Sequence, residues 1–182
     1  MTTSQPASAY DMPGAKVAES TATFALLVDN EPGVLHRVVG LFAARGYNIE
    51  SLTVAETDRR AHTSRITVVT RGTEQVLEQI EAQLSKVIAV RRVQDVTRDP
   101  NGVERELALI KVRGEGGDRV EALRVADIFR ARVIDTTAQS FVFELTGAPS
   151  KIDSFVELMR PMGLVELSRT GVLSIERGAE GM

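Results

Sequence analysis

Two periods of hydrophobic residues alternate along this chain. Short runs that are apolar throughout, or apolar at alternate positions, predict strands over residues 23–28, 49–55, 64–70 and 87–96. Between them lie runs with apolar residues three and four positions apart, which predict helices over 34–45 and 74–84. The first half therefore has the order strand, helix, strand, strand, helix, strand. Such a unit is an antiparallel sheet with both helices on one face.

The same order recurs in the second half of the chain. Strands are predicted over residues 106–112, 132–137 and 141–145, with one long or broken last strand over 164–175. Helices are predicted over 118–131 and from Pro149 onward. The two copies have little residue identity, so the repeat is one of element order. We therefore predict an α+β protein with two ferredoxin-like βαββαβ domains in tandem.

The ends and the middle of the chain differ from these periodic segments. Residues 1–20 are rich in Ser, Ala, Thr and Pro without any period, and we expect a disordered tail. Turn formers and charges over 98–102 predict a linker. The expected domains are then residues 21–97 and 103–177, followed by a short tail over 178–182. Domains this small have thin cores, so mutual packing or oligomerisation is expected to matter.

The most informative stretch joins the first strand to the first helix. Asp29, Asn30, Pro32 and Gly33 interrupt the apolar pattern, and Pro32 suits a first helical turn because its missing N–H would be unpaired there. Gly46 fits the left-handed position that ends a helix. A helix start carries unpaired N–H groups and a partial positive charge, which together favour a carboxylate or a phosphate.

From the residues alone, this stretch has two interpretations. In one, Gly33 lets a ligand approach the backbone, while Asn30 and Asn48 each offer a donor and an acceptor. That arrangement suits the carboxylate and ammonium groups of an amino acid. In the other, Asn30 only caps the helix and Gly33 only eases the turn.

The composition argues against several classes of function. The net charge of −3 over 182 residues gives no electrostatic case for nucleic acid. With no Cys, and with His36 and His62 as the only histidines, we predict neither catalytic nor metal-binding residues. Residues 114–117 lack the Lys and Ser or Thr of a phosphate loop and are interpreted as a flexible turn. Apolar runs are too short to span a membrane and no secretory pattern opens the chain, so a cytoplasmic location is expected.

Two neighbouring motifs resemble a known family. Residues 26–42, LLVDNEPGVLHRVVGLF, resemble the start of an ACT regulatory domain. Residues 45–55, RGYNIESLTVA, are more specific and resemble the small regulatory subunit of acetolactate synthase (acetohydroxyacid synthase). The similarity continues through 64–67, 76–84, 104–107 and 128–130, and covers nearly everything from Ala22 to Glu176.

The resemblance implies a regulatory role in the biosynthesis of valine, leucine and isoleucine. Small subunits of this family have no catalytic site. They bind and activate a catalytic subunit that transfers a two-carbon unit from pyruvate, and they confer feedback inhibition, usually by valine. Thiamine diphosphate, Mg²⁺ and FAD are then expected on the catalytic subunit, and no cofactor on this chain. The effector is expected between the paired ACT domains of a homodimer, at Asn30, Gly33, Val34, Leu35, Asn48 and Ile49.

Two alternatives stay open beside this one. The alternative function is that of a free-standing amino-acid sensor with a different client protein. An enzyme in its own right is disfavoured, because no cluster of titratable residues converges on a pocket. On charge alone, contacts with the catalytic subunit are suggested for Arg59, Arg60, Arg91 and Arg92.

Overall fold

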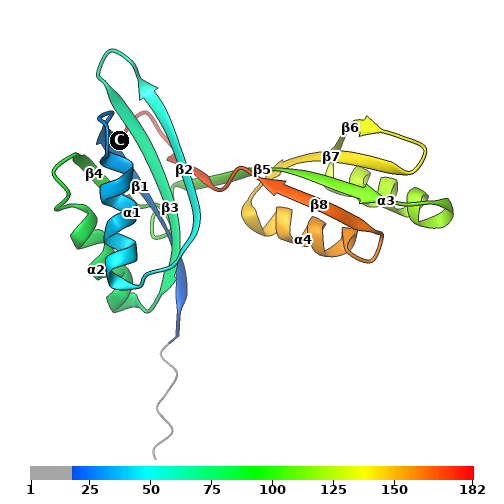
Figure 1. Ribbon diagram of the computed structural model, residues 1–182, viewed down its shortest axis with the longest axis horizontal. Coiled ribbons are helices and arrows are strands. Elements are labelled where there is room, and N and C mark those ends of the chain that lie inside the picture. The colour runs from blue at the N-terminus through cyan, green and yellow to red at the C-terminus, as the bar shows by residue number, and fades with distance from the viewer. Residues whose placement is uncertain (1–17) are drawn as a thin grey trace, which may run out of the picture.

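The computed structural model describes residues 18–182, so the tail expected over 1–20 lies almost wholly outside the described residues. Within them, the α+β class and the tandem βαββαβ order are confirmed (Figure 1). The first domain is a four-stranded sheet in the order β2-β3-β1-β4. Its strands are β1 (Ser20–Asp29), β2 (Ile49–Asp58), β3 (Thr63–Gly72) and β4 (Val90–Asp95), and its helices are α1 (Val34–Arg45) and α2 (Glu74–Leu84).

The second domain repeats this arrangement in the strand order β6-β7-β5-β8. Its elements are β5 (Gly102–Arg113), α3 (Gly116–Phe129), β6 (Arg132–Thr136), β7 (Ser140–Gly147), α4 (Pro149–Met159) and β8 (Leu164–Arg169). A further strand, β9 (Leu173–Glu176), pairs with the first residues of β5, from Gly102 to Arg105. Of the two forms expected for the last strand, the broken one is found, because Gly171 takes a left-handed φ of 82° between β8 and β9.

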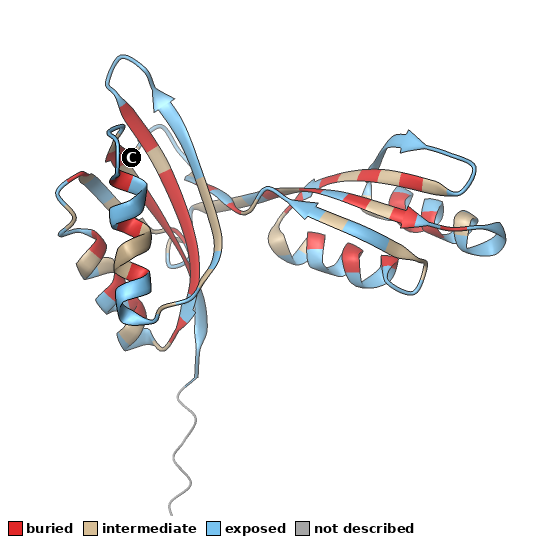
Figure 2. Cartoon of the chain, viewed as in Figure 1, coloured by how far each residue is buried: buried red, intermediate tan, exposed pale blue. Residues whose placement is uncertain are grey.

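Each domain has its own core between its sheet and its helices, which appears as the buried layer in Figure 2. In the first domain, Phe24 and Ile66 of the sheet belong to one cluster with Phe42 of α1. In the second, Phe143 of β7 meets Phe155 of α4 edge-on, with ring centroids 6.0 Å apart. The periodic apolar residues are therefore absorbed by packing, which leaves loops and sheet edges for function.

The two domains are joined by β5 and by the segment that leads into β9, and the C-terminal end returns to the first domain (Figure 1). A cavity of about 640 Å³ lies between them, with Thr21, Glu50 and Val69 on one side and Pro149 and Asp153 on the other. Across residues 18–182, no helix has both the length and the apolar character needed to cross a membrane.

Candidate functional site

The loop between β1 and α1 is fixed at its base. The N–H of Asp29 donates to the carbonyl of Ala89 at 2.9 Å, and the N–H of Asn30 donates to the carbonyl of His62 at 2.8 Å. Arg91 of β4 donates from Nε to Oδ1 of Asp29 at 2.6 Å. Arg91, suggested from its charge as a contact for another protein, is thus engaged in bracing the loop.

The start of α1 is open. Gly33 occupies the N-cap position with a left-handed φ of 86°, no side chain caps the helix, and no acidic residue lies in its first turn. A Cβ added at Gly33 would meet nothing within 4 Å. Because Gly33 and Leu35 are both exposed, the N–H groups and the positive end of the helix dipole are accessible from solvent.

Asn30 does not cap the helix. Its Nδ2 donates instead to Oε1 of Glu56 on β2, at 3.3 Å. The capping interpretation of Asn30 is therefore wrong. Glu56 was missed by the sequence analysis, because a polar residue near the end of an exposed strand carries no signal of its own. Together these side chains place an amide and a carboxylate in contact with one another, next to the loop that opens α1.

The six residues expected from the sequence fall into two groups. Asn30, Gly33, Val34 and Leu35 gather at the start of α1. The side chain of Leu35 is 41% exposed, whereas that of Val34 is 3% exposed and belongs to the first core. Asn48 and Ile49 follow the other end of α1, which Gly46 closes in the left-handed conformation.

The two groups lie too far apart to share a small ligand within one chain. β1 pairs with β3 so that Asp29 lies beside Thr63, and Oγ1 of Thr70 donates to the carbonyl of Asn48 at 2.6 Å. At about 3.3 Å per residue along β3, Thr63 and Thr70 are about 23 Å apart. One chain therefore cannot close both groups around one amino acid.

Other candidate sites are limited. The residues that line the 640 Å³ cavity include none of the six expected effector residues. Throughout residues 18–182, no group of three or more His, Cys, Asp or Glu side chains could hold a metal ion.

Known proteins match this chain over most of its length. Residues 24–92 match a family model described as an AHAS small subunit-like ACT domain, and residues 105–178 match one described as the small subunit of acetolactate synthase. The chain is 47% identical to the probable acetolactate synthase small subunit of Archaeoglobus fulgidus, over 86% of this chain and 96% of that one. It is 46% identical to the acetolactate synthase isozyme 3 small subunit of Escherichia coli, over 84% and 93%. The crystal structure of the acetolactate synthase small subunit from Thermotoga maritima has a TM-score of 0.77 and 38% identity, covering 88% of this chain and 99% of that one.

Proposed function

This chain belongs to the family of acetolactate synthase small subunits, and from that premise we propose that it activates the catalytic subunit and confers feedback inhibition by valine. The observation that carries the effector assignment is the uncapped start of α1 behind Gly33, on a loop with a fixed base. Catalysis is assigned to the partner, with its thiamine diphosphate, Mg²⁺ and FAD, and this chain supplies no catalytic residue. The proposed site of action is the cytoplasm, as part of the biosynthetic role.

The groups at the start of α1 suit an amino-acid effector. The N–H of Val34 donates to the carbonyl of Glu31 at 3.4 Å, so the valine carboxylate is assigned to the next two N–H groups, those of Leu35 and His36. No acidic side chain in the first turn competes for the helix dipole. The ammonium is assigned to the amide oxygen of Asn30 and the carboxylate of Glu56. These two side chains already touch, since Nδ2 of Asn30 donates to Oε1 of Glu56. Leu35, which is 41% exposed, supplies apolar surface for the isopropyl group.

A second copy of the chain is needed to bring Asn48 and Ile49 to this site. β2 is an edge strand of the first sheet and is exposed along most of its length. Antiparallel pairing of two β2 strands about a twofold axis is self-complementary, and it covers an edge that would otherwise be left open. It also sets the start of one β2, with Asn48, beside the end of the other, where Glu56 contacts Asn30. The proposed site thus lies between two chains.

The decisive experiment adds the purified chain to an acetolactate synthase catalytic subunit that lacks its own small subunit. The expected result is a higher rate, followed by a decrease in rate when L-valine is added and no decrease with D-valine. Calorimetric titration of the chain alone with both enantiomers then tests whether the effector site forms without the catalytic subunit.

The outcomes separate the candidate functions. A complex with a raised rate but no response to valine would remove the effector assignment and keep the regulatory subunit. Stereoselective binding of valine without any complex would instead favour the free-standing amino-acid sensor.

A further inference from the structure

The C-terminal segment holds the second domain against the first. We call residues 170–176 the strap, because they lead from β8 through β9 back to the first domain (Figure 1). The N–H of Val172 donates to Oγ of Ser51 at 3.1 Å, and Oγ1 of Thr53 donates to the carbonyl of Val172, also at 3.1 Å. Ser51 and Thr53 belong to β2, so the strap is attached to the edge strand of the first sheet.

The strap fits β2 closely at one glycine. Gly171 has a left-handed φ of 82°, and a Cβ there would lie 2.4 Å from Oγ of Ser51 and 3.1 Å from Cγ2 of Thr53. A larger residue would displace either the Ser51 hydroxyl that accepts from Val172 or the strap itself, and it would be strained at this φ. The absence of a side chain at Gly171 is therefore a requirement of this contact, in addition to allowing the turn.

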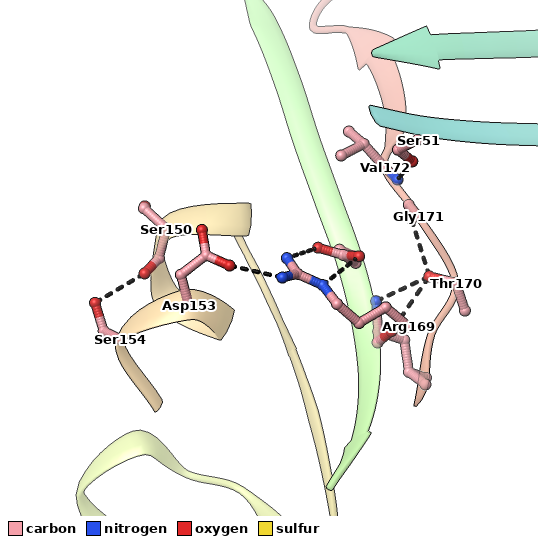
Figure 3. Close-up of polar contacts among 10 residues, drawn as sticks. Ser51, Ser150, Asp153, Ser154, Arg169, Thr170, Gly171 and Val172 are labelled. Atoms are coloured by element: carbon pink, nitrogen blue, oxygen red, sulfur yellow. Dashed lines mark hydrogen bonds and ion pairs between the residues drawn. The ribbon is translucent and has the colours of Figure 1, made fainter. Parts of the chain in front are cut away.

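The other end of the strap is anchored firmly in the second domain (Figure 3). Arg169, which precedes it, donates from Nε to Oε1 of Glu106 at 2.8 Å and from Nη1 to Oδ1 of Asp153 at 2.7 Å. Glu106 is buried whereas the side chain of Arg169 is 32% exposed, so this is a partly buried pair. The N–H of Thr170 donates to the carbonyl of Leu107 at 3.0 Å. Movement of the strap would therefore move the second domain with it.

The surface between the strap and the first sheet is polar, and some of its buried groups lack a hydrogen-bond partner. Arg65, Glu104 and Ser174 each have a buried side-chain atom without a hydrogen-bond partner. Ser174 lies opposite Glu104 in the β5–β9 ladder, and Arg65 is on the same face of β3 as Thr67, the neighbour of Thr53. Unpaired buried groups make this contact weak compared with either apolar core. An interface of this kind between domains is expected to open and rearrange.

β2 connects these observations with the proposed effector site. Asn48 and Ile49 stand at its start, Glu56 lies near its end, and Ser51 and Thr53 lie between them. We propose that the strap transmits effector binding from β2 to the second domain, so that Ser51, Thr53 and Gly171 position the second domain for inhibition without contacting the effector. This inference rests on the proposed function. It adds to that function the route by which effector binding beside β2 reaches the second domain.

The test compares two variants in the reconstituted holoenzyme. In Ser51→Ala/Thr53→Val both hydrogen bonds from β2 to Val172 are lost. In the control, Thr57→Val, one side-chain bond of the same strand is lost, from Thr57 Oγ1 to the carbonyl of Thr63, and the strap is untouched. The double variant should bind L-valine as the wild type does and should retain activation. Its valine concentration for half-maximal inhibition should rise about five-fold or more, the range of ordinary allosteric coupling. The control should match the wild type.

A second measurement reads the domain arrangement directly. The chain has no Cys, so Ile88→Cys and Ile128→Cys, at side chains 95% and 76% exposed in the two domains, give unique sites for a pair of spin labels. Labelled chains are diluted with unlabelled chains and bound to the catalytic subunit. L-valine should shift the distance distribution in the wild type, and the shift should be absent when the labelled chain carries Gly171→Ala.

The outcomes distinguish this inference from the proposed function. If the wild type neither binds nor responds to valine, the proposed function fails and the inference fails with it. If the wild type is inhibited and the strap variants show the same inhibition and the same distance shift, the strap has no part in the signal and only the inference is overturned.

Discussion

The two domains share one fold but differ at the turn between the first strand and the first helix. Gly33 before α1 and Gly116 at the start of α3 both have left-handed φ values, 86° and 56°, and a Cβ at either would meet nothing within 4 Å. The α1 start has no acidic residue in its first turn, whereas α3 has Asp118 there. The positive end of one helix is therefore free for a ligand, while the other has a carboxylate of its own.

The turn before α3 is exposed as well, but the arginine that follows Asp118 is engaged in contacts with the β6–β7 region. Arg119 of α3 lies over the ring of Phe141, with 3.9 Å between its Cζ and the ring centroid. It donates to Oγ1 of Thr136 at 3.3 Å and to the carbonyl of Ala138 at 3.5 Å. At the first turn the nearby arginine is Arg91 of β4, which donates to Asp29 and leaves Gly33 open. Both turns are thus exposed, and they differ in charge: α3 has Asp118 in its first turn, whereas α1 has no acidic residue there. Side chains near the loop, and not the fold, make this difference.

The strongest test of this difference is to make the same substitution at both glycines. Gly33→Asp should abolish inhibition by valine, since its carboxylate would occupy the place of the ligand carboxylate, and affinity should decrease about 100-fold or more through lost charge-assisted hydrogen bonds. Gly116→Asp introduces the same residue at a matched left-handed position, and Asp tolerates that conformation better than most residues. It should leave valine affinity unchanged. Calorimetry on both variants is the measurement, with activation of the catalytic subunit as the check on folding. Equal losses in both variants would refute the site at Gly33.

The domains also differ in their edge strands, and the second prediction uses this difference. Val54 in β2 is 46% exposed and Val133 in β6 is 40% exposed, so the two sites are closely matched. Val54→Lys should weaken self-association about ten-fold, because two like charges would approach each other across paired β2 strands. Val133→Lys should have no effect on assembly. Sedimentation over a range of concentrations measures both, and dissociation caused by Val133→Lys alone would move the proposed interface to the second domain.

The sequence predicts features that depend on neighbouring residues better than features that depend on contacts between distant ones. Ile66 and Val68 stand at alternate positions because the face of β3 that they share packs into the first core, so apolar periodicity predicts strands and helices well. The turn at Gly33 could also be predicted from the sequence, because the residues that indicate it are neighbours in the chain. The contact of Asn30 with Glu56 joins residues far apart in the chain, and the polar positions of β2 show no pattern that would indicate it. The strap was missed for the same reason, since Ser51 and Thr53 resemble ordinary exposed strand residues until Val172 is placed against them.

A third prediction replaces Arg119 of α3 and Arg91 of β4 with alanine, one at a time. Arg119→Ala should lower the free energy of unfolding by about 1 kcal/mol, through loss of its contact with Phe141, and should leave valine binding intact. Arg91→Ala should reduce valine affinity a few-fold, because the loop at Asp29 loses its brace. Its effect on stability should be smaller, because this ion pair is partly exposed to solvent. Denaturant unfolding measures the stability of each variant, and calorimetry measures its affinity for valine. Loss of valine affinity in Arg119→Ala would contradict the view of the second turn as a purely structural one.

The smallest expected effect is a response to pH that differs between the strap and the second domain. The pKa of Glu176 is raised above its ordinary value, first by a hydrogen bond with Asp99, then by burial and by the charge of Asp99, while Arg92 and Arg65 act in the opposite direction. The pKa of Glu166 is lowered, first by its hydrogen bond with Lys111 and then by the charge of that lysine.

The signs of the two shifts predict opposite responses. A raised carboxyl pKa means that the folded state binds a proton more strongly, so the strap contact should be strongest at acid pH and weaken as pH rises through the raised pKa of Glu176. The pair of Glu166 with Lys111 should contribute above the ordinary carboxyl pKa and be lost as pH falls through its lowered value. The distance distribution between labels at residues 88 and 128 should therefore narrow as pH is lowered from neutral through the raised pKa of Glu176, before the pair of Glu166 with Lys111 is lost at its lowered pKa. Glu176→Gln should reproduce the narrow distribution at pH 7, because it removes the repulsion from Asp99, and Glu166→Gln should not. If neither pH nor Glu176→Gln changed the distance distribution, the strap would be held rigidly. Its unpaired polar atoms would then not make it free to move.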